Sequence, residues 1–406
     1  MDTKKKESDS LPTILELRRH FHRFPEIGFE EIQTTQEILR LTEDLGCKQY
    51  YGKELYEEGP NPSLRHIQYI KEGYTGVLLE FEGEKPYILV RADIDGLPVP
   101  ESESEDHFPH KEGFRSIHPN RMHACGHDGH ISLGISLARH LHQNPPTRGV
   151  RIIFQPAEEG VQGAVALAPW IMKDVQQVLG FHIGLGQSPH TIGVGSTHFL
   201  AAKKLNLTFH GKSAHSANDP QSGICALSLA TAFYPLAQQL TRDRSCLKML
   251  NVGTIHGGTA KNALMESVTL GMDIRCTTDE GMEELFSGLK QIAQGVADSR
   301  KASHTMEIIG ECTAYEEDNG PLVQSICDIL EEKGLSTIPF PNFGASEDVT
   351  VFMKKARQQR GEALHLLLGT DLKGSHHAPD FDFPEEDLEF FLTSVLTVFQ
   401  TMMQRR

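Results

Sequence analysis

What the sequence lacks most clearly is a long apolar run. No stretch among its 406 residues approaches the roughly 18 consecutive apolar residues of a membrane helix. Three lysines stand at positions 4–6, but no apolar segment follows them, so we expect no secretory signal there. The seven cysteines are scattered and odd in number, which is typical of free thiols in a reducing compartment. We therefore expect a cytoplasmic protein without a membrane partner.

Positive charge is also scarce. Lys and Arg number 39 against 55 Asp and Glu, which gives a formal net charge of −16. Such an acidic chain is poorly suited to bind nucleic acid or an anionic membrane surface. Hydrophobic residues make up 38% and charged residues 23%, as in soluble globular proteins. A chain of this length is too long for one ordinary core, so we expect two domains.

The first 199 residues alternate short apolar runs with helical patterns. Apolar residues at helical spacing predict helices that begin after Ser10 and that span 33–45 and 131–142. β-rich runs predict strands over 75–81, 87–90, 150–154 and 178–181. This alternation predicts an α/β fold with an open mixed sheet flanked by helices. Ligands of such sheets bind at the carboxyl ends of the strands.

The pattern changes between residues 200 and 313. Strands are predicted over 204–210, 249–253, 267–275 and 305–309, with helices over 224–240 and 281–297. The resulting order, β-α-β-β-α-β, is the split ferredoxin-like pattern. We interpret 200–313 as an inserted α+β domain that interrupts a domain built from 1–199 and 314–406. In the last part, helices are predicted over 322–333 and 385–403 and a strand over 364–368.

The most informative segment is Met122–His130. It holds three histidines, a cysteine and an aspartate within nine residues. Cys125 and His127 stand two apart, so both can reach one metal ion, and thiolate and imidazole are good ligands for zinc-like ions. Two glycines allow the backbone to bend tightly around a ligand. The alternative is a polar loop with a buried structural thiol.

A second polar cluster, Gln155–Gly160, follows a predicted buried strand. Its adjacent carboxylates can take different roles, because one of Glu158 and Glu159 can coordinate a cation while the other acts as a general base on water. Adjacent glutamates are also common on solvated surfaces. His182 ends the next predicted strand, where it is either a ligand or an ordinary hydrogen-bonding residue.

Other polar residues leave more than one reading open. His376 and His377 are adjacent and point in different directions, so at most one is expected to be a ligand. Asp93 and Asp95 either bind metal, orient a ligand histidine, or cap the turn that follows them.

Two loops of the inserted domain each present one polar side chain. His215 lies in 211–216 and Asn262 in 257–262. Both side chains can donate hydrogen bonds to a developing oxyanion, although both loops can equally be plain turns.

Together these segments are similar to the aminoacylase/carboxypeptidase family of two-metal amidohydrolases. The resemblance runs from Leu17–Glu26 through Arg91–Asp95 and the two clusters to Ala345–Asp348 and His377. The branch is that of N-acyl-amino-acid hydrolases, indole-acetyl-amino-acid hydrolases and hippuricases. Within it, Phe181–Gly184, Ser346–Thr350, Gly369–Thr370 and His376–Phe383 most resemble the aminobenzoyl-glutamate hydrolases.

The resemblance implies a metallopeptidase-like catalytic domain that cleaves the amide bond of a small N-acyl amino acid, such as aminobenzoyl-glutamate. It implies two divalent ions, Mn²⁺ or Zn²⁺, whose expected ligands are Cys125, His127, Glu159, His182 and His377. Glu158 becomes the general base. His215 and Asn262 become binders of the scissile carbonyl or of the carboxylate end of the substrate. The inserted domain is expected to form a homodimer and to lend its histidine to the partner's site, or the chain pairs with a related subunit.

The chain departs from this family at two positions. Met265 stands where relatives often have proline, which weakens the assignment of Asn262, and Ser216 stands where many have alanine. Arg275 matches a family arginine, either structural or substrate-binding. The alternatives for function are a metallo-amidase that acts on dipeptides or N-acetyl-diaminopimelate, and a non-catalytic subunit of a heteromeric hydrolase.

Overall fold

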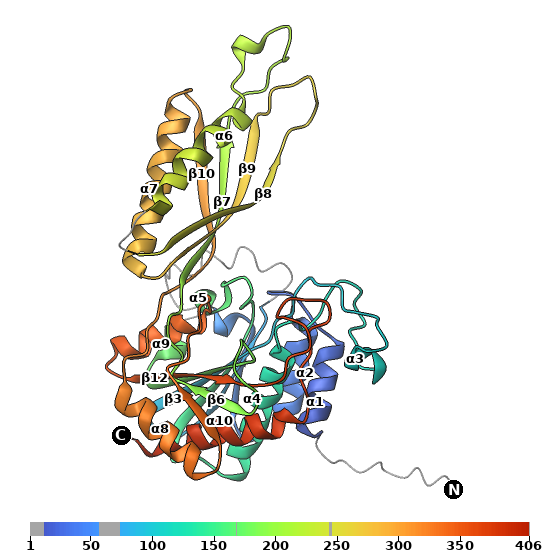
Figure 1. The fold of residues 1–406 in the computed structure, drawn as a ribbon, viewed down its shortest axis with the longest axis vertical. Helices are drawn as coiled ribbons and strands as arrows, with labels where there is room; N and C mark the ends of the chain where they lie inside the picture. Colours follow the sequence, from blue (N-terminus) through green and yellow to red (C-terminus); the bar gives the residue numbers. More distant parts are fainter. Residues whose placement is uncertain (1–11, 57–73, 168, 243–245, 406) are drawn as a thin grey trace.

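The computed structural model describes residues 12–56, 74–167, 169–242 and 246–405. Residues 1–10, where no secretory signal is expected, lie outside them. Figure 1 shows two units: a large unit built on an eight-stranded sheet, and an inserted unit, residues 201–312, built on a four-stranded sheet. None of the helices in these described ranges has the length and apolar character needed to cross a bilayer.

The eight-stranded sheet of the large unit is mixed, as the sequence predicts. Its order is β1-β2-β4-β3-β5-β12-β6-β11. The four central strands, β4, β3, β5 and β12, run parallel, whereas β2 pairs with β4 and β6 pairs with β12 in antiparallel register. The strands are β1 Lys48–Tyr51, β2 Val77–Phe81, β3 Glu84–Asp93, β4 Arg148–Gln155, β5 Val175–Ile183, β6 Thr191–Val194, β11 Ser336–Pro339 and β12 Glu362–Leu368.

Helices cover both faces of this sheet. One face packs against α1 Ile14–Arg23, α2 Ile32–Thr42, α4 His127–Gln143, α8 Gly320–Glu332 and α10 Asp387–Gln404. The other face packs against α5 Gly163–Ala166 and α9 Val349–Gln358. Because both faces are covered, every residue of β2 and β4 is buried, which explains the continuous apolar runs in the sequence. A further short helix, α3 Phe108–Lys111, lies at the periphery.

The inserted unit has the ferredoxin-like order that the sequence predicts. Its sheet is antiparallel with the order β10-β7-β9-β8. Burial alternates along β7 and β9 because α6 and α7 cover one face only. The elements are β7 Ala201–His210, α6 Ala226–Ala237, β8 Lys248–Gly257, β9 Ser267–Cys276, α7 Asp279–Asp298 and β10 Ser303–Cys312. Residues 200 and 313 as domain boundaries stay a prediction.

Sequence patterns miss the short elements. Strands β1, β6 and β11 have four residues each, too few for an alternation of burial to be recognised. Helix α9 is also missed, although its N-terminal end carries Glu347 and Asp348 toward the edge of the sheet where β3 and β4 end.

Candidate metal centre

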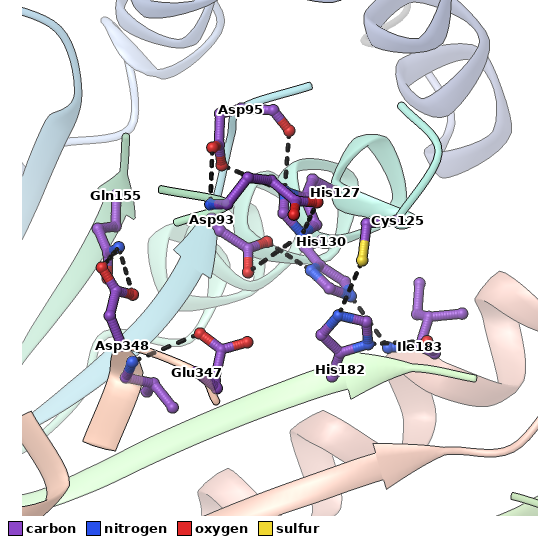
Figure 2. A network of polar contacts seen from close by, with 12 residues as sticks. Asp93, Asp95, Cys125, His127, His130, Gln155, His182, Ile183, Glu347 and Asp348 are labelled. Atoms are coloured by element: carbon purple, nitrogen blue, oxygen red, sulfur yellow. Dashed lines mark hydrogen bonds and ion pairs between the residues drawn. The ribbon is translucent and has the colours of Figure 1, made fainter. Parts of the chain in front are cut away.

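The candidate site lies where the central parallel strands end. β3 ends at Asp93, β4 ends at Gln155, β5 ends at Ile183, one residue after His182, and α4 begins at His127. Parallel strands place their carboxyl ends at one edge of the sheet. Residues far apart in sequence therefore meet, as Figure 2 shows.

Three of the expected ligands form one buried group. The ligand atoms of Cys125, His127 and His182 all lie within 4.8 Å of one another. The Sγ atom of Cys125 is 3.5 Å from Nε2 of His182. All three side chains are buried, so a cation placed between them would be enclosed by a thiol and two imidazoles.

Backbone carbonyls determine which nitrogen each histidine presents. Nδ1 of His127 donates to the carbonyl oxygen of Asp95 at 2.8 Å, and Nδ1 of His182 donates to that of Ile183 at 2.8 Å. With the proton on Nδ1, the lone pair of each ring lies on Nε2. Nε2 of His182 faces the thiol of Cys125, and Nε2 of His127 lies 3.9 Å from a carboxylate oxygen of Glu159. Both rings are therefore oriented as metal ligands usually are.

A second group shares Cys125 with the first. Cys125, Glu159 and His377 place their ligand atoms within 4.8 Å of one another, and so do His127, Glu158 and Glu159. Nε2 of His377 lies 3.3 Å from Oε2 of Glu159. The structure thus brings together every metal ligand that the resemblance implies, together with Glu158.

His376 and His377 differ in their contacts. Nε2 of His376 accepts from the backbone N–H of Leu185 at 3.1 Å, so its proton is on Nδ1, which points to the Cys125 sulfur at 3.5 Å. Burial lowers the pKa of His376 to about 3. The side chain of His377 is 54% exposed and its lone pairs are not taken up in this way. Of the two, His377 is the better placed ligand.

The donor set fits a divalent cation. In the part of the chain that the structure describes, three buried atoms of the site have no hydrogen-bond partner: Nε2 of His127, Oε1 of Glu159 and Oδ1 of Asp95. Unpartnered buried polar atoms are rare in folded proteins and often mark an ion. The residues Asp93, Asp95, Glu158, Glu159, Glu347 and Asp348 also gather negative charge in one small region. Such charge needs compensation by cations.

The pKa values report the same excess of negative charge. Burial and the neighbouring carboxylates of Glu347 and Glu159 raise the pKa of Glu158 well above its ordinary value. Burial alone would lower the pKa of His127, yet Asp93 and Asp95 raise it to about 10. Burial lowers the pKa of His182 well below its ordinary value, which keeps that ring neutral.

Sequence patterns miss the cation that supports this edge. Arg91 is fully buried and pairs with Asp93, with Glu347 at 2.7 Å and with Asp348 at 2.9 Å, and it donates to Oε1 of Gln155 at 3.0 Å. An arginine inside an apolar strand, two residues before its last residue, is the signal that could have revealed this role.

The structure settles two residues that the sequence leaves open. Nδ1 of His130 lies 2.5 Å from Oδ1 of Asp93, and its Nε2 accepts from the N–H of Ile183 at 3.0 Å. Both ring nitrogens of His130 are thus occupied, so it orients Asp93. Asp95 accepts from the backbone N–H of Glu159 at 3.0 Å and holds that ligand's loop.

His215 and Asn262 do not reach this cluster in one copy of the chain. Their loops lie together, because the N–H of Ser216 donates to the carbonyl oxygen of Asn262 at 3.0 Å and His215 forms a β-bridge with Ala263. Neither side chain is buried. Figure 1 places these loops at the end of the inserted unit that is remote from the large unit.

Comparisons with known proteins agree with this geometry. Residues 89–400 match the peptidase family M20/M25/M40. The chain is 32% identical to a homolog, from Haemophilus influenzae, of one p-aminobenzoyl-glutamate hydrolase subunit, over 97% of this chain and 98% of the relative. It is 30% identical to the indole-3-acetyl-aspartic acid hydrolase of Enterobacter agglomerans, over 97% of each. The fold is similar to that of an aminobenzoyl-glutamate utilization protein from Klebsiella pneumoniae, with a TM-score of 0.76 at 21% identity, over 97% of this chain and 96% of that one. The expected resemblance is confirmed.

Proposed function

The chain belongs to peptidase family M20/M25/M40 and is a hydrolase of amide bonds, and on that premise we propose that it cleaves N-acyl amino acids at a two-metal site. The observation that carries this proposal is the pair of overlapping donor groups that meet at Cys125. Two groups that share one ligand suit two neighbouring ions. The inward Nε2 atoms of His127 and His182 support the same arrangement.

In this proposal Cys125, His127, Glu159, His182 and His377 hold the ions. When bound, two divalent cations polarise the scissile carbonyl and lower the pKa of water from near 16 toward about 7. The thiolate favours Zn²⁺, whereas the imidazole and carboxylate ligands also suit Mn²⁺. Add-back of each metal after chelation will distinguish the two.

Glu158 is the general base in this proposal. Its carboxylate is buried and lies within 4.8 Å of the ligand atoms of His127 and Glu159. From there a carboxylate oxygen takes a proton from the attacking water and delivers it to the leaving nitrogen. The scissile bond is thereby cleaved without a charged amide nitrogen as leaving group.

The substrate class follows from the relatives. One curated relative is named for p-aminobenzoyl-glutamate and another for indole-3-acetyl-aspartate, and both compounds join an aromatic acyl group to an acidic amino acid. We propose the same class here. Arg275 is a candidate for binding a substrate carboxylate. Besides burial and His127, the positive charges of Lys204 and Arg275 lower the pKa of His377, which places Arg275 close to the centre.

The site needs a second polypeptide to be complete in this proposal. His215 and Asn262 lie remote from the metal ligands of their own chain, so we assign them to the site of a partner subunit. The partner is a second copy joined through the inserted domain, 200–313, or a related subunit. Each of the seven cysteines, all among the described residues, is a free thiol, which supports a cytoplasmic location.

The test is hydrolysis of a panel of N-acyl amino acids that includes aminobenzoyl-glutamate, indole-acetyl-aspartate, dipeptides and N-acetyl-diaminopimelate. We expect activity that chelation abolishes and that Mn²⁺ or Zn²⁺ restores. Glu158→Gln should lower kcat by about 10²- to 10⁴-fold with metal content unchanged. The exposed Glu332→Gln is the matched control and should act like the unaltered protein. Normal turnover in Glu158→Gln would remove the proposed base, and hydrolysis of dipeptides alone would replace the substrate class.

A further inference from the structure

The loop between β4 and α5, residues 156–162, carries both Glu158 and Glu159 in an unusual backbone. Ala157 has φ 55° and Val161 has φ 47°, so two non-glycine residues adopt the left-handed region. Side chains rarely adopt this conformation, and it persists where the surrounding structure holds it. The question is therefore what holds this loop.

The large unit holds one side of the loop through carboxylates. The N–H of Ala157 donates to Oε1 of Glu31 at 2.9 Å, and the N–H of Glu159 donates to Oδ2 of Asp95 at 3.0 Å. Just beyond the loop, the N–H of Ala164 donates to Oδ2 of Asp348 at 2.9 Å. These three contacts belong to the sheet edge already described.

The inserted unit holds the other side of the loop. Nζ of Lys204, on β7, donates to the carbonyl oxygen of Glu159 at 2.7 Å. The N–H of Glu311, on β10, donates to the carbonyl oxygen of Val161 at 2.7 Å. β10 also approaches so closely at Gly310 that a Cβ there would lie 2.3 Å from the carbonyl oxygen of Gly160.

Lys204 differs from its neighbour Lys203 because successive side chains of a strand point to opposite faces. Nζ of Lys203 binds Glu311 at 2.6 Å and Glu283 at 3.2 Å, on the side of helix α7. Lys204 points the other way, to the residue that we assign as a metal ligand. The two lysines are thus a natural matched pair.

We propose that Lys204 is a positioning residue for Glu159, and that the inserted unit is thereby part of the machinery that holds the metals. A hydrogen bond from an ammonium group to a carbonyl is among the stronger ones in proteins. It restrains the peptide that carries the Glu159 side chain from the side opposite to Asp95. This inference rests on the proposed function insofar as Glu159 is a metal ligand.

The experiment compares Lys204→Met, Lys204→Arg and Lys203→Met with the unaltered full-length protein. Metal-free protein is titrated with Mn²⁺ and with Zn²⁺, and kcat and KM are measured at saturating metal. We expect Lys204→Met to weaken metal binding by about 10- to 100-fold, as losses of groups that support metal ligands do. Lys204→Arg should keep most of the affinity because it can still donate. Lys203→Met should bind metal like the unaltered protein.

Hydrogen exchange of the metal-free proteins gives a readout that is independent of activity. Amides of residues 156–163 should exchange faster in Lys204→Met than in Lys203→Met, while those of β3 and β5 stay equally protected. This comparison also shows that both variants are folded.

Unchanged metal affinity in Lys204→Met would overturn the proposal. A rise in KM alone, with unchanged metal binding, would make Lys204 a substrate-binding residue instead. The metal titration keeps its meaning even when no compound of the substrate panel is hydrolysed. A failure of the proposed function and a failure of this inference are therefore distinguishable.

Discussion

The large unit and the inserted unit place their polar residues in opposite ways. In the large unit most candidate functional residues are buried at strand ends, where a second partner orients them, such as the Asp95 carbonyl for His127. In the inserted unit His215 and Asn262 stand unburied on remote loops. Buried polar groups require fully matched partners, whereas exposed ones do not. The difference indicates a metal centre complete within one chain and a substrate site completed by another.

The largest expected effect tests that division of labour. Glu158→Gln and His215→Ala should each lower kcat, the first by about 10²- to 10⁴-fold. When the two are co-expressed with different tags and the mixed dimer is purified, one of its two sites contains both intact residues. The mixed dimer should therefore have about half of the unaltered activity, because a two-fold dimer has two equivalent sites. An inactive mixed dimer would contradict the exchange of His215 between copies.

The next effect compares one buried and one partly exposed arginine. Arg91→Met leaves Asp93, Glu347 and Asp348 without their buried cation, which should cost about 3–5 kcal/mol of the free energy of unfolding. Arg275→Met removes an ion pair to Asp273 whose side chains are about one-third exposed, and it should cost at most about 1 kcal/mol. Denaturant unfolding of both variants measures the contrast. Equal losses would show that the two units do not differ as described.

A third comparison uses pH. Burial alone lowers the pKa of His22, but hydrogen bonds to Asp128 and Glu101 raise it to about 9. Because the folded-state pKa is the higher one, this stabilisation is fully present below pH 6.5 and is lost as the pH rises through 9. It amounts to about 3 kcal/mol. In the inserted unit burial lowers the pKa of His304, so its effect has the opposite sign and stability is lost as the pH falls.

Thermal unfolding between about pH 6 and pH 9.5 checks the two signs. His22→Gln should flatten the loss of stability on the alkaline side, and His304→Gln should leave that side unchanged. An unaltered alkaline slope in His22→Gln would show that this buried network does not control it.

The smallest effect concerns one helix cap in each unit. The Thr13 side chain accepts from the N–H of Glu16 at the start of α1, and that of Thr278 accepts from the N–H of Gly281 at the start of α7. Replacement of either threonine by alanine should cost about 1 kcal/mol. Hydrogen exchange should locate the loss in the large unit for Thr13→Ala and in the inserted unit for Thr278→Ala. A loss spread over both units in either variant would show that they unfold together.

Much of the fold was predictable because its elements are long and periodic. The alternation of burial along β7 and β9 is visible in the sequence, and so are the continuous apolar runs of the central strands. Short strands such as β1 and β6 were not predictable, since four residues carry too little periodicity.

The sequence by itself determined the local chemistry of the site. The spacing of Cys125 and His127 and the adjacent Glu158 and Glu159 are local facts, and they pointed to a metal centre without any coordinates. Their roles as ligands and base stay predictions. What a short segment can do depends on which donor groups it carries, and this is readable residue by residue.

Only the tertiary structure decided which groups share that site and which do not. Arg91 joins it from within a strand, and Lys204 reaches it from the inserted unit. His215 stays away from it in the same chain. These relations depend on sheet order and on the packing of one unit against the other. No local spacing encodes them, because they arise only when strands distant in sequence end at the same edge.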